Sequence, residues 1–244
     1  MPNRLTPSAM YASVTSYLRD LEESGVEGVP HELQGAADTP AYANRQGAQS
    51  GSSTLADVRQ LLGDCQRCGL ATGRTKLVFG AGNPQARLLF VGEAPGVDDD
   101  RRGEPFVGDA GGILNRIIDA MGLKREQVYI CNVLKCRVPA NRHPHKDELE
   151  ACAPFLAQQI RAIGPELIVA LGTCATQTLL QRKEPISQLR GQFHSYHGIP
   201  VMPTFHPSFL LHHKDNKQLY WEVWNDMVLV LERLGLPVPE KKRT

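Results

Sequence analysis

Four of the six cysteines lie where they could hold a metal ion or a cluster. Cys65 and Cys68 form a C-x-x-C pair, Cys136 lies in the Pro- and Arg-rich stretch KCRVPANR, and Cys152 follows in a helical pattern. A C-x-x-C pair holds two thiolates on one side of a tight turn, as a tetrahedral metal or a cluster requires. The spacing of the cysteines in the sequence does not distinguish a zinc site, an iron–sulfur cluster and incidental free thiols. A metal centre here would have a structural role, because it joins segments distant in the sequence.

The other two cysteines have a simpler interpretation. Cys131 and Cys174 lie inside or against apolar runs, where a free cysteine behaves as a small buried hydrophobic residue. We therefore expect them to pack in the core.

The densest polar pattern is the stretch FVGEAPGVDDDRRGEPFVGDAGGILNRII, which begins at residue 90. An apolar run passes into Gly-Glu-Ala-Pro-Gly at 92–96, a turn with exposed backbone amides and little side-chain bulk. Three aspartates follow at 98–100, and Phe106 precedes a Gly-rich helix entry whose N-terminus could meet a phosphate. Taken alone, this pattern would fit any nucleotide-binding domain.

Further polar residues follow other apolar runs. Asn132 can present a carbonyl and an amine to one edge of a planar, amide-like ligand. His206, in Phe-His-Pro-Ser, can donate a hydrogen bond to developing negative charge. The stretch 135–146 contains several Lys, Arg and His residues and no acidic residue, which suits contact with a phosphate backbone.

The elements that must position these residues alternate along the chain. Short apolar runs predict strands at 87–92, 128–133, 166–172 and 199–205. Longer periodic patterns predict helices at 54–64, 110–121, 146–163, 173–181 and 216–234. This alternation favours a mostly parallel sheet with helices on both faces. Ligands of such folds bind beyond the carboxyl ends of the strands, where residues 92–96, 132 and 204–208 all fall.

Composition and length narrow the class of protein. The chain has 244 residues, is 41% hydrophobic and carries a net charge of +1, which excludes a wholly disordered chain. No apolar run approaches the roughly 18 residues of a membrane span, and no signal-peptide core is found near the start. We expect no membrane association and a cytoplasmic, nucleoid-associated location.

The chain divides into three parts. Residues 1–53 predict a short helix, with an apolar stripe between Tyr11 and Leu21, followed by a Gly-, Ala- and Ser-rich linker. Residues 54–238 form the expected catalytic domain, and residues 239–244 are a C-terminal tail.

Together these motifs resemble the family 4 uracil-DNA glycosylases, the iron–sulfur branch of the uracil-DNA glycosylase superfamily. The resemblance covers roughly residues 57–234. The matching motifs are C-x-x-C at 65–68, GEAPG at 92–96, EPFVGDAGGILNRII at 104–118, YICNVLKCRVPANR at 129–142, LRGQ at 189–192 and FHPSFLL at 205–211.

The resemblance implies an α/β fold, a three-layer α/β/α sandwich around a four-stranded, mostly parallel sheet. It implies a [4Fe–4S] cluster on Cys65, Cys68, Cys136 and Cys152. It also implies cleavage of the N-glycosidic bond of deoxyuridine in DNA, leaving an abasic site. The expected partner is uracil-containing DNA, single- or double-stranded, and the expected state is a monomer.

Individual roles are implied in the same way. Phe106 matches the aromatic residue that stacks on the flipped uracil, Asn132 the amide that reads its O4 and N3 edge, and His206 the histidine near its O2. Gly92, Ala94 and Ser208 are expected to line the same base site. The residues expected around the attacked sugar carbon and its water are Glu93, Asp99 and Asn141.

Three positions differ between branches of the superfamily in ways that bear on the chemistry. The family usually has Glu where this chain has Asp99, a shorter carboxylate that could misplace a water. Ala94 stands where the best-known uracil glycosylases have a water-activating aspartate. A related branch has histidine at the position of Asn141 and traps DNA covalently, so Asn141 predicts turnover here.

Three alternatives remain at this point. One is a glycosylase of the same fold for another base, such as hypoxanthine. Another is a non-catalytic protein that binds uracil-containing or single-stranded DNA. The third is a zinc-stapled nucleotide-binding domain.

Overall fold

All four predicted strands are present in the computed structural model, which describes residues 53–239. They are β2 (Leu88–Gly92), β3 (Tyr129–Asn132), β4 (Leu167–Leu171) and β6 (Ile199–Thr204). They pair in parallel in the order β3-β2-β4-β6. All residues of β2, β3 and β4 are buried, as expected of parallel strands covered on both faces.

The prediction of a four-stranded sheet is wrong, because the sheet has six strands. The short β1 (Ala81–Gly82) pairs antiparallel with β3, and β5 (His194–Tyr196) pairs antiparallel with β6. Both are edge strands of two or three residues without a buried apolar run. Their sequences carry no strand pattern, since their neighbours in the sheet supply the pairing.

The predicted helices are also present, each within a residue or two of its expected ends. They are α2 (Leu55–Leu62), α4 (Asp109–Ala120), α5 (Lys146–Ile163), α6 (Gly172–Leu180) and α9 (Lys217–Arg233). Three shorter helices were not predicted: α3 (Val97–Arg102), α7 (Ile186–Leu189) and α8 (Pro207–His212). The expected N-terminal helix, most of the linker and most of the C-terminal tail lie outside the described residues.

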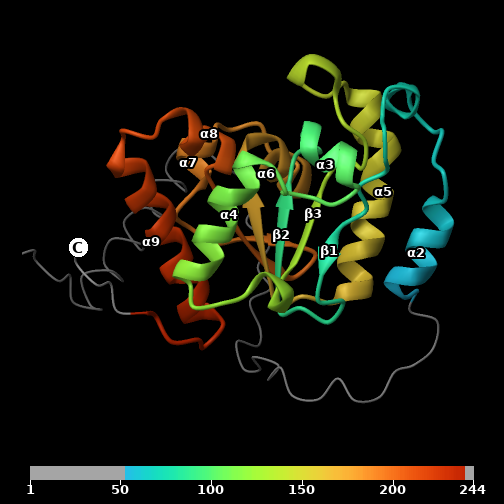
Figure 1. The fold of residues 1–244 in the computed structure, drawn as a ribbon. Helices are drawn as coiled ribbons and strands as arrows, with labels where there is room; N and C mark the ends of the chain where they lie inside the picture. The colour runs from blue at the N-terminus through green and yellow to red at the C-terminus, as the bar shows by residue number, and fades with distance from the viewer. Residues whose placement is uncertain (1–52, 240–244) are drawn as a thin grey trace, which may run out of the picture. The chain divides into compact units, whose positions relative to one another are not determined.

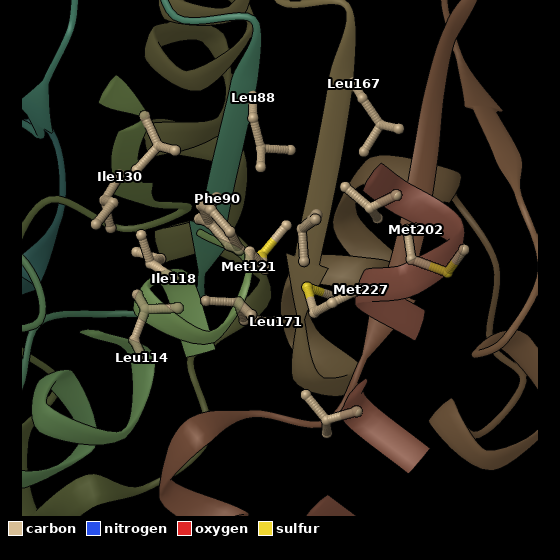
Figure 2. Packing of buried hydrophobic residues seen from close by; sticks show 14 of the residues in the cluster. Leu88, Phe90, Leu114, Ile118, Met121, Ile130, Leu167, Leu171, Met202 and Met227 are labelled. Atoms are coloured by element: carbon tan, nitrogen blue, oxygen red, sulfur yellow. The ribbon is translucent and has the colours of Figure 1, made fainter. Parts of the chain in front are cut away.

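Helices cover both faces of the sheet, so the elements form three layers (Figure 1). On one face, Leu88 and Phe90 of β2 pack with Ile118 of α4 and with Met121, which follows α4. Figure 2 shows these side chains together with Met227 of α9. On the other face, alternate strand residues pack against α5 and α6. Because side chains of a strand alternate between faces, one apolar run supplies both layers of the core.

This architecture brings the carboxyl ends of the parallel strands to one edge of the sheet. The residues that leave β2, β3 and β6 at this edge are the ones in which sequence analysis found polar groups. Among the described residues, no helix is both long and apolar enough to cross a membrane.

Candidate active site

A cavity of about 630 Å³ opens where the strands end. Its lining comes from the segments after β2, β4 and β6 and from the start of α4. Six of the predicted site residues line it: Glu93, Ala94, Asp99, Phe106, His206 and Ser208. The tertiary structure therefore brings together residues more than 100 positions apart.

Asn132, at the end of β3, is not among the residues that line this cavity, and its amide is unsatisfied. It is 1% exposed, and neither Nδ2 nor Oδ1 has a hydrogen-bond partner in the described structure. Gly92 pairs with it across β2 and β3; a Cβ at Gly92 would overlap Asn132 Oδ1 and approach Phe106 Cζ to 2.6 Å. A buried amide without a partner costs about 1–3 kcal/mol, so this donor and acceptor are set for a ligand.

Phe106 is held in an unusual backbone conformation. Its φ is 52°, a left-handed value that is rare for an aromatic residue, and it is 5% exposed. A Cβ at Gly111, in the first turn of α4, would overlap the Phe106 carbonyl, so this close approach needs glycine. Backbone strain at a cavity wall is typical of a functional position.

His206 has a defined tautomer. It caps the N-terminus of α8, and its Nδ1 accepts a hydrogen bond of 3.1 Å from the backbone N–H of Ser208. The proton of the neutral ring is therefore on Nε2. Burial lowers the pKa of His206 to about 4, against which the charge of Asp99 acts only partly, so the ring is neutral near pH 7. Its ring centroid lies 5.7 Å from that of Phe106.

Glu93 is half-buried, and this desolvation raises the pKa of its carboxyl group. A charge on His143 and a hydrogen bond with the Cys174 thiol act in the opposite direction. The prediction that Cys174 is simply a buried core residue is therefore incomplete, since it is half-buried and contacts a site carboxylate. Cys131, in contrast, is fully buried in the core as expected.

Asp99 lines the cavity, and both of its carboxylate oxygens accept hydrogen bonds from backbone N–H groups. Its Oδ1 accepts a 2.8 Å hydrogen bond from the Val107 N–H, and its Oδ2 accepts one of 3.2 Å from the Gly96 N–H. It is 7% exposed. These contacts tie the glycine turn to the residue that follows Phe106, so Asp99 holds two walls of the cavity together.

The position of the Asn141 side chain relative to the cavity is not described. Asn141 ends the 3-10 turn Pro139–Asn141, and its side chain is outside the described part of the structure.

The next residue, Arg142, lines the cavity and forms hydrogen bonds of 2.9 and 2.6 Å with the buried Glu148 carboxylate. Arg142 holds the pKa of Glu148 at about 2, so this pair stays ionised and anchors the loop. Sequence analysis missed Glu148 because it resembles an ordinary helix residue.

The four predicted cluster ligands lie near one another. Cys68 and Cys152 pack against Cys136 in one small apolar cluster, and Cys65 and Cys68 act electrostatically on Cys136. Arginine N–H groups donate to two of the sulfurs, from Arg67 to Cys65 at 3.3 Å and from Arg74 to Cys136 at 3.4 Å. Such contacts stabilise thiolates and are typical around metal-bound sulfur.

The four thiols are candidate ligands of a metal centre. In residues 53–239, no three His, Cys, Asp or Glu side chains form a group that could hold one metal ion. A zinc ion needs its sulfurs within a sphere of about 2.3 Å radius, whereas each cysteine of a four-iron cluster binds a different iron. Four cysteine thiols are a donor set for either group.

A buried lysine lies close to these cysteines. Lys135 is 1% exposed, and its Nζ donates to the backbone carbonyl of Asn132 at 2.5 Å. Within the described residues it forms no ion pair with a carboxylate, but its charge acts on Cys152. Burying an ammonium group is costly without a compensating negative charge. An anionic group on the cysteines would supply that charge.

Comparisons with known proteins agree with this site. The family model of the uracil DNA glycosylase superfamily matches residues 79–228. The type-4 uracil-DNA glycosylase of Thermotoga maritima is 44% identical over 162 residues, which are 66% of this chain and 84% of the relative. The type-4 enzyme of Saccharolobus solfataricus is 43% identical over 157 residues, 61% of this chain and 73% of the relative.

A more distant relative is the type-5 uracil-DNA glycosylase of Thermus thermophilus. It is 35% identical over 119 residues, which are 42% of this chain and 53% of the relative. The higher identity and wider coverage lie with the type-4 proteins. The chain belongs to the uracil-DNA glycosylase superfamily, within its type-4 family.

Proposed function

We propose that this protein hydrolyses the N-glycosidic bond between uracil and deoxyribose in DNA, releasing uracil and leaving an abasic site for base-excision repair. The observation that carries the proposal is the buried, unpaired amide of Asn132 beneath Phe106. Uracil presents an acceptor at O4 next to a donor at N3. An amide offers one donor and one acceptor in the complementary arrangement.

The same amide accounts for selectivity against cytosine. Cytosine has an amine where uracil has O4 and an acceptor at N3, so both contacts with Asn132 would pair like with like. Buried donors and acceptors would then be left without partners, at a cost of about 1–3 kcal/mol each. A Cβ at Gly92 would clash with both Asn132 and Phe106, so glycine allows these two side chains to lie close together.

Access to this site requires the base to leave the DNA stack. Extrusion of a nucleotide costs a few kcal/mol, less for a mispaired base. Stacking on an aromatic ring recovers about 1–3 kcal/mol per base, and Phe106 is the ring in position to supply it. The basic stretch 135–146, with Arg142 at the edge of the cavity, suits contact with the phosphate backbone.

Cleavage of the bond leaves negative charge on uracil and positive charge on the sugar. The Nε2–H of His206 would donate to uracil O2 as the bond breaks. Because burial lowers the pKa of His206, the ring is a neutral donor near pH 7. Glu93 is the cavity carboxylate suited to balance the sugar cation or orient the water. Asp99 acts mainly by holding the cavity walls, because backbone amides occupy both of its oxygens.

We further propose a [4Fe–4S] cluster on Cys65, Cys68, Cys136 and Cys152. It would be structural and would join the segment before β2 to the segment after β3 and to α5. The grouped thiols, their arginine donors and the buried Lys135 support it. Purification without oxygen should give a brown protein containing iron and acid-labile sulfide in equal amounts; a colourless zinc protein would contradict the cluster.

The deciding experiment uses an oligonucleotide with one deoxyuridine and alkaline cleavage at abasic sites. Cleavage at uracil by the wild type, lost in His206→Ala and kept in His197→Asn, is the expected result. His197 is exposed in the turn between β5 and β6, so it is a matched control. A uracil-dependent gel shift without cleavage would indicate a binding protein, and preference for a hypoxanthine oligonucleotide would indicate another lesion.

Assembly and location follow as lesser proposals. One chain contributes every group named above, so we propose that it acts as a monomer on single- or double-stranded DNA, which sedimentation with and without DNA would test. Chromosomal DNA as the substrate favours a cytoplasmic, nucleoid-associated location.

A further inference from the structure

A buried carboxylate lies directly behind the strand that carries His206. Asp226 of α9 is 1% exposed, and its Oδ2 accepts a 2.6 Å hydrogen bond from the Thr204 hydroxyl. Thr204 is the last residue of β6, two residues before His206. This contact therefore joins α9 to the end of the strand that delivers the imidazole to the cavity.

Arg190, which follows α7, contacts the same carboxylate with two nitrogens. Nη2 donates to Asp226 Oδ1 at 2.9 Å, and Nε donates to Oδ2 at 3.2 Å. Nη2 also donates to the Glu222 carbonyl at 2.6 Å, and Nη1 lies 3.2 Å from the Glu222 carboxylate. The guanidinium lies over the ring of Phe205, 5.0 Å from its centroid. One side chain thus contacts α9 and the residue before His206.

These contacts explain the LRGQ motif, whose residues are absent from the lining of the cavity. Leu189 is 1% exposed and anchors the end of α7 in the core. Gly191 has φ 76°, and a Cβ there would lie 3.7 Å from Asp226 Oδ1. The motif places a guanidinium against a buried carboxylate, beside α8 and α9 (Figure 1).

The location of this group favours a role in geometry over one in stability. The hydrogen bonds of the His206 side chain stay within its own loop, on Ser208. The end of β6 must therefore fix the loop relative to the sheet. A buried ion pair contributes little net stability, because desolvation offsets the attraction between its charges.

We propose that Arg190 and Asp226 are positioning residues for uracil release, holding Thr204 and Phe205 so that the His206 Nε2–H meets the departing base. The inference rests on the proposed function. Displacing a reacting group by about 1 Å can cost about 100-fold in rate, so small shifts at the end of β6 are enough to matter.

The test compares kcat and KM for excision of uracil from a single-lesion oligonucleotide, well below the melting temperature. Thr204→Val keeps the shape of the side chain and removes its hydrogen bond to Asp226, and Thr204→Ser restores the hydroxyl. Arg190→Lys keeps the charge and removes the two-nitrogen contact. The matched control is Arg87→Lys, because Arg87 also contacts a carboxylate through two nitrogens, on Glu166, and also contacts a backbone carbonyl.

We expect kcat to fall about 10-fold or more in Thr204→Val and Arg190→Lys, with KM within about twofold of the wild type. Thr204→Ser should recover most of kcat, and Arg87→Lys should keep it. Normal kcat in both Thr204→Val and Arg190→Lys, even with lower melting temperatures, would overturn the inference. Absence of excision by the wild type and by Arg87→Lys would instead overturn the proposed function.

Discussion

The backbone N–H of Ser208 donates to Nδ1 of His206 at 3.1 Å, and this contact decides which nitrogen of the ring carries the proton. With Nδ1 acting as an acceptor, Nε2 is left as the donor of a neutral imidazole. The pair is built into the first turn of α8, so the tautomer is set before any DNA binds. In the proposed reaction, His206 would then need no change of protonation before the bond breaks.

This relationship predicts the pH dependence of excision. Burial lowers the pKa of His206 to about 4, so the imidazole should stay neutral from pH 5 to 9. Single-turnover rates should therefore show no inflection near pH 6.5 that depends on His206. His143→Gln is the control, because the exposed His143 acts electrostatically on Glu93. An inflection near 6.5 that survives in His143→Gln would contradict a neutral His206.

The same shift in pKa predicts how stability depends on pH. Between about pH 6.5 and 4, the unfolded chain binds a proton at His206 that the folded chain does not bind. The free energy of unfolding should therefore fall as the pH falls through this window, with no contribution from His206 above it. Urea titrations of the wild type and His206→Gln measure this dependence. Between pH 6.5 and 4, the free energy of unfolding should fall less in the variant than in the wild type. Equal losses would show that His206 titrates normally in the folded chain.

Asn132→Leu should separate stability from function. Leucine has nearly the same shape but removes the two amide atoms that lack partners in the folded protein. We expect excision to fall by about 30- to 150-fold, since two contacts worth about 1–1.5 kcal/mol each are lost. The melting temperature should stay equal or rise, because an unsatisfied buried group is gone. A clear fall in melting temperature would mean that the amide has an internal partner in solution.

Gly92→Ala should block the base site sterically. Its Cβ would overlap Asn132 Oδ1 and Phe106 Cζ, so the two side chains proposed to hold uracil would be displaced. We expect free uracil to lose its ability to inhibit, and excision to fall by about 10-fold or more. Gly112→Ala is the control, because a Cβ there meets no atom within 4 Å and alanine favours the helix. Inhibition by uracil that persists in Gly92→Ala would move the base site elsewhere.

Asp99→Asn should loosen the cavity wall. An amide can accept from only one of the two backbone N–H groups, those of Gly96 and Val107, that the carboxylate now satisfies. We predict a loss of about 10-fold in kcat, smaller than the loss in His206→Ala. The neighbouring Asp98→Asn is the control, because Asp98 is exposed and only pairs weakly with Arg101. If Asp99→Asn lost as much activity as His206→Ala, Asp99 would have a direct part in the chemistry.

Much of the fold could be predicted from local patterns. The apolar runs that became β2, β3, β4 and β6 are long enough to be recognised, and the helix α5 begins and ends at its predicted residues. Motif resemblance named the residues Glu93, Phe106 and His206 that line the cavity. These features depend on neighbouring residues or on short motifs, so one chain is enough to find them.

The sequence by itself determined the parallel sheet, the helices that cover it and the chemical groups that follow its strands. Only the tertiary structure decided the two edge strands, the role of Asp99 between Gly96 and Val107, and the burial of Asn132 without a partner. It alone joined Arg190 to Asp226, which are 36 residues apart. The physical reason is that a hydrogen bond or a buried charge depends on the distance between folded segments, which no local periodicity encodes.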